Sequence, residues 1–193
     1  MVYTSLNNAQ IIEWLKANLN EERFIHSIGT ADCARELALK FGLNAEKAYV
    51  AGLLHDCAKC LENSELLNII NANLKVEACE LINPKTYHAP VGAFIAKREF
   101  GVGDEEILSS IRWHTLGHLE MNNFDKIIFL ADKIEPNTRC KEYRDKMLEL
   151  LDKKGLDAAL LICYQETIKS LVERNLKICV NTIEIYNELL NKV

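Results

Sequence analysis

Apolar residues recur mainly at spacings of three and four along almost the whole chain, and few residues interrupt the pattern. Only eight glycines and three prolines occur among 193 residues. This spacing lines apolar side chains along one face of a helix, whereas the alternation typical of strands is hard to find. The sequence therefore predicts an all-helical fold. Because no internal repeat or linker is visible, we expect a single domain over residues 1–193, with about 141–192 completing the helical bundle.

Capping residues and glycines divide the chain into predicted helices. Asn20 and Asn44 are side-chain types that cap helix N-termini, and Gly42, Gly101 and Gly117 are of the type that ends a helix. We expect helices over about 8–19, 21–41, 45–60, 64–73, 90–100, 104–117, 126–135, 141–153 and 157–190, the last with a break near Asn175.

Charge and hydropathy exclude several classes of partner. Lysine and arginine number 23 against 28 acidic residues, a net charge of −5, so no basic field draws nucleic acid or anionic lipid. The longest apolar run, Ala158–Tyr164, is far shorter than the roughly 20 residues of a membrane helix. The first ten residues carry no secretory pattern, so we expect a cytoplasmic protein. A phosphate ligand would need a local cationic site.

Seven cysteines, an odd number, favour free thiols over a disulfide framework in that compartment. Cys57 and Cys60 have the CxxC spacing, but no second such pair and no βαβ pattern accompany them. We interpret the cysteines as small packing residues.

Two aspartates interrupt or close apolar runs where a core is expected. Asp56 follows Ala51–Leu54 and His55, and Asp132 closes the run 127–131. Burying a carboxylate there is costly unless a cation or hydrogen-bond donors compensate its charge. Both positions therefore predict a bound cation or a network of donors.

Four histidines complete this set. His26, His88 and His114 lie in or near the ends of predicted helices, and His55 precedes Asp56. Taken singly, each is more often a hydrogen-bonded, half-buried side chain than a ligand. Together, four histidines and two aspartates form one nitrogen and oxygen ligand set that suits iron, manganese or zinc.

The order of these residues resembles that of the HD-domain metal phosphohydrolases, in which a His, His-Asp, Asp pattern marks a helical metal site. More narrowly, the chain resembles the YqeK-type symmetrical bis(5′-nucleosyl)-tetraphosphatases, which split diadenosine tetraphosphate into two ADP. The resemblance covers about residues 21–140. It rests on five blocks: Arg23-Phe-Ile-His26-Ser, Gly52-Leu-Leu-His55-Asp56-Cys-Ala-Lys59, His88-Ala-Pro-Val-Gly-Ala93, Ile111-Arg-Trp-His114-Thr115 and Leu130-Ala-Asp132-Lys-Ile-Glu135-Pro136-Asn137.

This resemblance implies a centre of two divalent or mixed-valence metal ions, iron in the first place, with manganese or zinc as the other options. Asp56 would bridge the two ions and, with Lys59, act in catalysis. The implied metal ligands are His26, His55, Asp56, His88, His114 and Asp132. Nucleotide phosphates would lie against His26, Lys59, His88 and Thr115.

The chain departs from the family pattern at two places. After the fourth histidine the usual Thr-Thr-Gly-Arg is here Thr115-Leu-Gly-His118, so His118 would take the place of an arginine that binds phosphate. The usual Glu-Pro-Asn-Arg carries one inserted residue, Thr138, before Arg139. Arg139 is therefore a further candidate phosphate ligand.

The resemblance implies that metal-activated water attacks an inner phosphorus and that ADP leaves, its charge stabilised by Lys59 and Arg139. Other HD-type reactions remain open: a 5′-nucleotidase or a guanosine alarmone hydrolase, and, from other classes, a di-iron oxygenase or a non-catalytic nucleotide sensor. Part of the apolar C-terminal region would serve as the face of a homodimer, if one forms.

Overall fold

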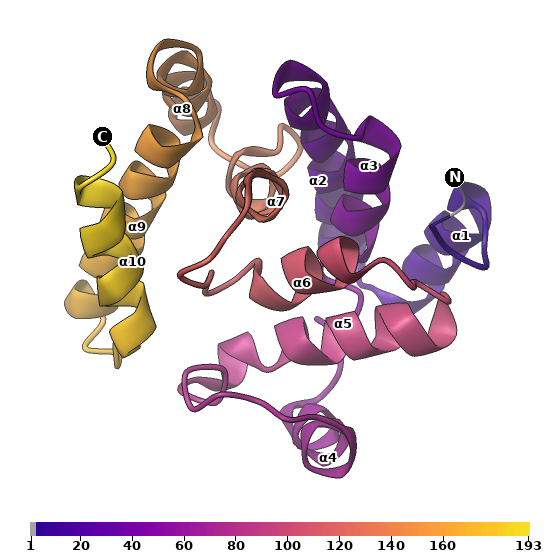
Figure 1. Cartoon of the computed structure of the whole chain (residues 1–193). Coiled ribbons are helices and arrows are strands. Elements are labelled where there is room, and N and C mark those ends of the chain that lie inside the picture. The colour runs from indigo at the N-terminus through magenta and orange to yellow at the C-terminus, as the bar shows by residue number, and fades with distance from the viewer. Residues whose placement is uncertain (1–2) are drawn as a thin grey trace.

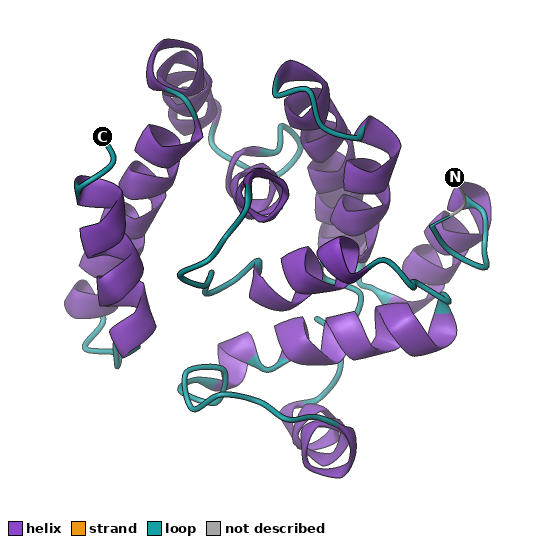
Figure 2. Ribbon diagram, in the orientation of Figure 1, coloured by secondary structure: helices purple, strands orange, loops and turns teal. Residues whose placement is uncertain are grey.

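The structure, a computed structural model, describes residues 3–193. This part of the chain forms ten α-helices, one short 3₁₀ helix and no strand (Figures 1 and 2). The predicted all-helical class is confirmed. Among the described residues, no helix is both long and apolar enough to cross a lipid bilayer.

Most helices lie where the capping pattern predicts them. Asn20 and Asn44 accept hydrogen bonds from the backbone N–H groups of Arg23 and Lys47, and Asn175, with φ of 52°, breaks the C-terminal segment. The bounds are α1 Asn8–Asn18, α2 Glu21–Lys40, α3 Ala45–Leu54, α4 Asn63–Asn73, η1 Pro84–Thr86, α5 His88–Glu99, α6 Glu105–Trp113, α7 Asn123–Ile134, α8 Lys141–Lys154, α9 Leu156–Glu173 and α10 Val180–Leu190.

The predicted helix over 45–60 is wrong beyond Leu54. The imidazole Nδ1 of His55 lies 2.7 Å from the Gly52 carbonyl, and the chain then continues in turns, in which Cys57 N–H bonds to Leu54 O at 3.1 Å. The helix expected to end at Gly117 likewise stops at Trp113. In both places the side chain at the helix terminus is a histidine of the candidate site.

Other helix boundaries differ by a few residues. The helix α7 begins at Asn123 rather than at 126, because Asn122 and Asp125 form a capping box. The helix α4 begins at Asn63, one residue before the expected Ser64, and α5 begins at His88, two residues before Pro90.

The helices α2 and α3 pack side by side, α7 packs against both, and α5 packs along α6. Figure 1 shows α7 nearly end-on at the centre, with α8, α9 and α10 along one side. Gly52 permits the close approach of α3 to α2, because a Cβ there would lie 2.6 Å from the Ala31 Cα. The main apolar core includes residues from Ile11 in α1 to Leu189 in α10.

Candidate metal centre

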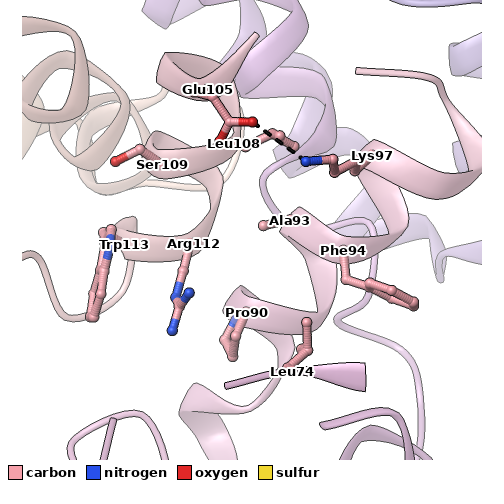
Figure 3. A pocket seen from close by; sticks show the side chains of 10 residues that line it. All are labelled: Leu74, Pro90, Ala93, Phe94, Lys97, Glu105, Leu108, Ser109, Arg112 and Trp113. Carbon is pink, nitrogen blue, oxygen red and sulfur yellow. Dashed lines mark hydrogen bonds and ion pairs between the residues drawn. The ribbon is translucent and has the colours of Figure 1, made fainter. Parts of the chain in front are cut away.

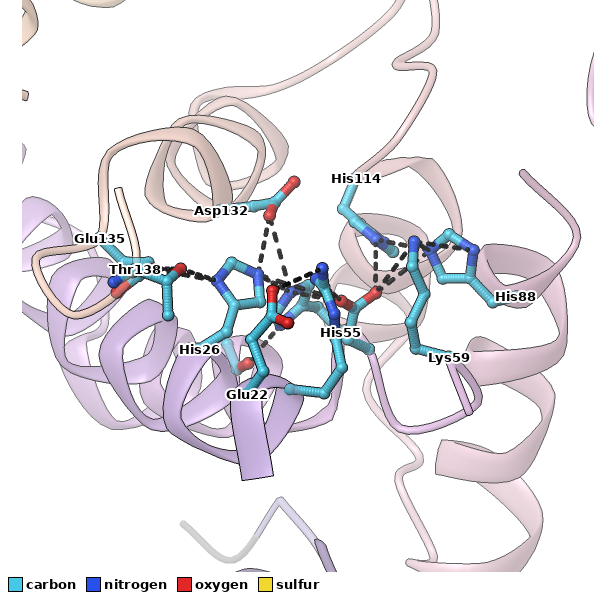
Figure 4. Close-up of polar contacts among 12 residues, drawn as sticks. Glu22, His26, His55, Lys59, His88, His114, Asp132, Glu135 and Thr138 are labelled. Atoms are coloured by element: carbon cyan, nitrogen blue, oxygen red, sulfur yellow. Dashed lines mark hydrogen bonds and ion pairs between the residues drawn. The ribbon is translucent and has the colours of Figure 1, made fainter. Parts of the chain in front are cut away.

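Six predicted ligands from five segments of the chain meet in the interior, where α2, α3, α5, α6 and α7 converge (Figure 4). The exposed fraction of each is 6% or less. They are His26 from α2, His55 and Asp56 from the turn after α3, His88 at the start of α5, His114 at the end of α6 and Asp132 from α7.

Asp56 lies between two pairs of histidines. Its Oδ2 is 3.7 Å from His55 Nε2 and 4.0 Å from His26 Nε2, whereas its Oδ1 is 3.1 Å from His88 Nε2 and 3.4 Å from His114 Nε2. Two buried groups of ligand atoms, each compact enough for one metal ion, thus share this carboxylate. A bridging carboxylate has this arrangement.

Asp132 extends the first of these groups. Its Oδ1 lies 3.0 Å from His26 Nε2 and 3.9 Å from His55 Nε2. The same carboxylate accepts hydrogen bonds from Lys133 at 2.5 Å and from Arg139 at 2.9 Å. Within the described part of the chain, the second group, around His88 and His114, has no such additional carboxylate in its compact set.

Hydrogen bonds at Nδ1 assign the protons of three of the imidazoles. The Nδ1–H of His55 donates to Gly52 O and that of His114 donates to Ile111 O, both at 2.7 Å, while His26 Nδ1 lies 3.1 Å from Glu135 Oε1. The rings of His55 and His114 therefore direct an Nε2 lone pair into the centre, whereas His26 Nε2 lies 3.0 Å from Asp132 Oδ1.

These lone pairs face other ring nitrogens. The two Nε2 atoms of His26 and His55 are 3.3 Å apart, and those of His88 and His114 are 3.2 Å apart. Two ring nitrogens this close require a proton or a metal cation between them. Asp56 Oδ1 is also buried without a hydrogen-bond partner among the described residues. The donor set therefore fits a divalent metal ion in each half.

Burial sets the protonation states. It lowers the pKa of His55 to about 3 and that of His88 to about 4. Burial alone would raise the pKa of Asp56, but neighbouring histidines, His55 first, hold that pKa well below its usual range. Neutral imidazoles beside an ionised carboxylate are the forms that bind a metal ion.

His26 behaves differently. Burial alone would lower its pKa, yet hydrogen bonds to Asp132 and Glu135 leave that pKa raised. Burial would raise the pKa of Asp132, but Lys133 and then His26 hold it well below its usual range. The first half of the centre therefore has two ionised carboxylates, Asp132 and Glu135, in contact with one imidazole.

The predicted phosphate ligands lie at different distances from the centre. Lys59 Nζ is 3.0 Å from His88 Nε2 and 3.8 Å from Asp56 Oδ1. Arg139 donates to Asp132, and Thr115 Oγ1 is buried without a hydrogen-bond partner among the described residues. His118 lies apart from the cluster, with its Nε2 3.3 Å from Asp125 Oδ2.

Three neighbours of the centre were not singled out from the sequence. Glu135 is fully buried and bonds to His26, and Gly29 makes room for it, since a Cβ there would lie 2.3 Å from Glu135 Oε2. Arg23 Nη1 lies 3.2 Å from Asp56 Oδ2, and Lys133 contacts Asp132. Arg23 was detectable, because it precedes His26 by one helical turn on the same face.

Comparisons with known proteins agree with this geometry. The HD-domain family model matches residues 23–137. A Bacillus subtilis protein named "Bis(5'-nucleosyl)-tetraphosphatase, symmetrical" is 38% identical over 96% of this chain and 99% of its own length. A protein of the same name from Halalkalibacterium halodurans is 34% identical, over 96% of this chain and 98% of its own length.

A crystal structure of a predicted HD superfamily hydrolase involved in NAD metabolism, from Clostridium acetobutylicum, superposes with a TM-score of 0.89 at 34% identity. The match covers 97% of this chain and 99% of the Clostridium acetobutylicum chain. The predicted resemblance is therefore confirmed. The chain belongs to the HD-domain family, among the relatives of the symmetrical bis(5′-nucleosyl)-tetraphosphatases.

Proposed function

We propose that this protein hydrolyses diadenosine tetraphosphate symmetrically into two ADP. The observation that carries the proposal is the sharing of Asp56 between two buried ligand groups, in a chain that matches relatives of that name over nearly its full length. Those names do not favour a 5′-nucleotidase, an alarmone hydrolase, an oxygenase or a sensor.

The proposed cofactor is a pair of iron ions. His26, His55, Asp56 and Asp132 would hold one ion, and Asp56, His88 and His114 the other. Metal ions bound there would supply positive charge for the phosphoryl oxygens and make water nucleophilic at neutral pH. The mixed imidazole and carboxylate set supports iron, and it also accepts manganese or zinc. Metal analysis of protein purified without added metal distinguishes the three.

The chain's own cations would hold the tetraphosphate. In the reaction, the oxygen of a water molecule bonds to one inner phosphorus, and the bond from that phosphorus to the oxygen bridging the two inner phosphates breaks. One ADP leaves with that oxygen and the electron pair, the other ADP keeps the water oxygen, and the protons of the water pass to solvent. Lys59 is within reach of this region because its Nζ lies beside Asp56 and His88. Burial lowers its pKa, while Asp56 and Asp132 oppose the shift. We assign Lys59 to stabilising the departing ADP.

Arg139, which contacts Asp132, and Thr115, which follows His114 in the chain, are proposed phosphate ligands. The Arg139 guanidinium is oriented by two bonds to Asp132, each 2.9 Å long, and its side chain keeps 34% exposure for a ligand. The Thr115 hydroxyl has an unused donor. His26 and His88 would also lie against the phosphates. His118 is a further candidate phosphate ligand, and it would have to break its contact with Asp125 before it could bind a phosphate.

Two finer points belong to the same proposal. All seven cysteines are free thiols, which supports a reducing compartment, and we infer the cytoplasm. The helix α10 exposes the apolar side chains Val180, Ile183 and Leu190, which supports a homodimer through this face, the option that the sequence leaves open. Sedimentation at two protein concentrations tests the second point.

The test of the function is product analysis. Protein purified without oxygen is incubated with diadenosine tetraphosphate, with and without added iron, and the nucleotides are separated by chromatography. We expect ADP as the sole product, dependent on metal. AMP together with ATP would mean that an outer phosphorus is attacked, and no product at all would reject the proposed substrate.

A further inference from the structure

The ring of His88 is the least anchored imidazole of the centre. The other three each contact a carbonyl or carboxylate oxygen through Nδ1, whereas within residues 3–193 the His88 ring contacts only Lys59 and the groups of the centre itself. The backbone at the start of α5 must therefore set where this ring lies. That start has Tyr87 as its N-cap, whose side chain makes no capping hydrogen bond.

The segment before His88 is held by Glu80. The backbone carbonyl of Glu80 accepts a hydrogen bond from the Thr86 hydroxyl at 2.7 Å, and Thr86 precedes His88 by two residues. The carboxylate Oε2 of Glu80 accepts a second hydrogen bond, from the backbone N–H of Glu77 at 2.8 Å. One residue thus fixes the path of the chain from α4 to α5.

Arg112 of α6 binds the same carboxylate. Its Nε donates to Glu80 Oε1 at 2.8 Å and its Nη2 donates to Oε2 at 2.6 Å, which is a bidentate pair. The same Nη2 donates to the Lys75 carbonyl at 2.9 Å. Glu80 is 1% exposed, so its charge requires this guanidinium. The ion pair therefore joins the segment that leads to His88 to the helix that ends beside His114.

The space between α5 and α6 increases the importance of this ion pair. A cavity of about 390 Å³ opens between the two helices, and both Arg112 and Pro90, in the first turn of α5, line it (Figure 3). Where such a cavity lies, fewer packed side chains fix the distance between the helices. The other contact across it, between Lys97 and Glu105, is an exposed ion pair of the kind that contributes little.

From these contacts we propose that Glu80 and Arg112 are positioning residues for the second half of the metal centre. Their ion pair sets the separation of His88 and His114, whose Nε2 atoms are 3.2 Å apart, and so the affinity of this half for its ion. This inference rests on the proposed function for the two-metal centre, but it requires no particular substrate.

The test measures the affinity of each half for iron(II) without oxygen, by competition with a coloured chelator. Glu80→Gln keeps the shape of the side chain and removes its charge, so we expect the second half to hold its ion about tenfold less tightly. Two backgrounds separate the halves. In His114→Ala, which disables the second half, Glu80→Gln should change the remaining affinity less than about twofold, and in His55→Ala it should weaken it about tenfold.

Equal weakening in the two backgrounds would overturn the proposal, because it would mean that the ion pair supports the fold in general. The matched control is Asp157→Asn, which removes the charge from another partly buried ion pair between two elements, Lys126 of α7 with Asp157 of α9 at 2.6 Å. This control should leave the affinities of both halves unchanged.

Arg112 provides a graded second test. Arg112→Ala leaves the buried carboxylate of Glu80 without its partner and should weaken the second ion about tenfold or more. Arg112→Lys keeps the charge but loses the bidentate geometry, so it should restore part of that affinity. Thermal unfolding of each variant shows that it is folded, and Arg112→Lys with Glu80→Gln decides the matter if Arg112→Ala does not fold. Wild-type affinity in all of these variants would contradict the proposal.

Hydrolysis of diadenosine tetraphosphate is measured in parallel, so that the two proposals fail separately. Wild-type hydrolysis together with unchanged metal affinity in Glu80→Gln rejects only the positioning role. A weakened second ion in that variant, without wild-type hydrolysis, rejects only the proposed substrate. A wild-type protein that binds a single ion rejects the positioning role outright.

Discussion

The two halves of the metal centre are built from the same kinds of side chain but are supported differently. In the half around His26 and His55, both rings donate to fixed acceptors, Glu135 and the Gly52 carbonyl, and Asp132 is held by two cations. In the other half, His114 donates to a backbone carbonyl, whereas among residues 3–193 the His88 ring has Lys59 as its one partner besides the centre itself.

This difference shows that two equally buried sites need not have the same affinity for a metal ion. His88 and His114 are as buried as His26, at 2% against 1% exposure. The half around His26 nevertheless has an additional carboxylate ligand and a buried carboxylate behind one imidazole, and such supporting groups raise metal affinity. We therefore expect the first half to bind its ion more tightly than the second.

Replacing one histidine in either half should have the largest effect on activity and on the number of metal ions retained. His55→Ala and His114→Ala should each lower activity at least about a hundredfold, because in the proposed reaction both ions would act on the same phosphate. After dialysis against a weak chelator, His114→Ala should retain about one ion per chain, and His55→Ala should retain less. Metal analysis measures this, and equal retention by the two variants would mean that the halves do not differ.

Glu135→Gln tests the support behind His26. The amide keeps the shape but loses the charge that holds the imidazole, so metal affinity in one half should fall about tenfold to a hundredfold. Glu142→Gln, an exposed position nearby, is the control. Competition with a coloured chelator gives both affinities. Unchanged affinity in Glu135→Gln would show that the Gly52 and Arg139 contacts suffice.

The pH dependence of stability sharpens the comparison for the metal-free protein. The pKa values of His55 and His88 are about 3 and 4 when folded, against about 6.5 when unfolded. Their contribution to stability is complete above pH 6.5 and is lost as pH falls toward 4, by up to about 1.4 kcal/mol per pH unit for each.

His26 has the opposite sign, because its folded pKa is raised. Its contribution is present below pH 6.5 and is lost as pH rises through the folded pKa. Urea denaturation of metal-free protein between pH 4 and 8 measures the sum. In His88→Gln the decline below pH 6.5 should be shallower, and the same slope as in the wild type would argue that His88 is not held neutral.

The smallest effect is expected at His118, outside both halves. If this residue takes the place of the usual arginine, His118→Arg should lower KM for diadenosine tetraphosphate about threefold through a stronger phosphate contact. Steady-state kinetics gives the answer. Because the histidine lies against Asp125, an unchanged KM would assign it to that contact alone.

Local signals predicted most of the helices and singled out the histidines and aspartates that lie together in the candidate centre. Asn20 and Asn44 cap helices by hydrogen bonds within one turn. Asp132 follows an apolar run, so its buried carboxylate needs a charged or hydrogen-bonding partner in any fold. The end of α3 at Leu54 was not predicted. It coincides with a contact inside the candidate site, the hydrogen bond between the His55 imidazole and the Gly52 carbonyl.

Contacts between distant segments were not predictable in this way. Glu135 is 109 residues from His26, and nothing in the sequence near either residue indicates their hydrogen bond. Leu116, Phe129 and Tyr164 line one cavity, and they come together only when the segment after α6 packs with α7 and α9. Residues of this kind are visible only in the folded structure.

The central claim is that Asp56 joins two metal sites into one centre. The most direct measurement is the metal content per chain of the wild type and of Asp56→Ala, each reconstituted with iron without oxygen and then dialysed. We predict two ions for the wild type, and for the variant at most one weakly held ion and no hydrolysis. Two ions retained by Asp56→Ala, or a single ion in a fully active wild type, would contradict the account.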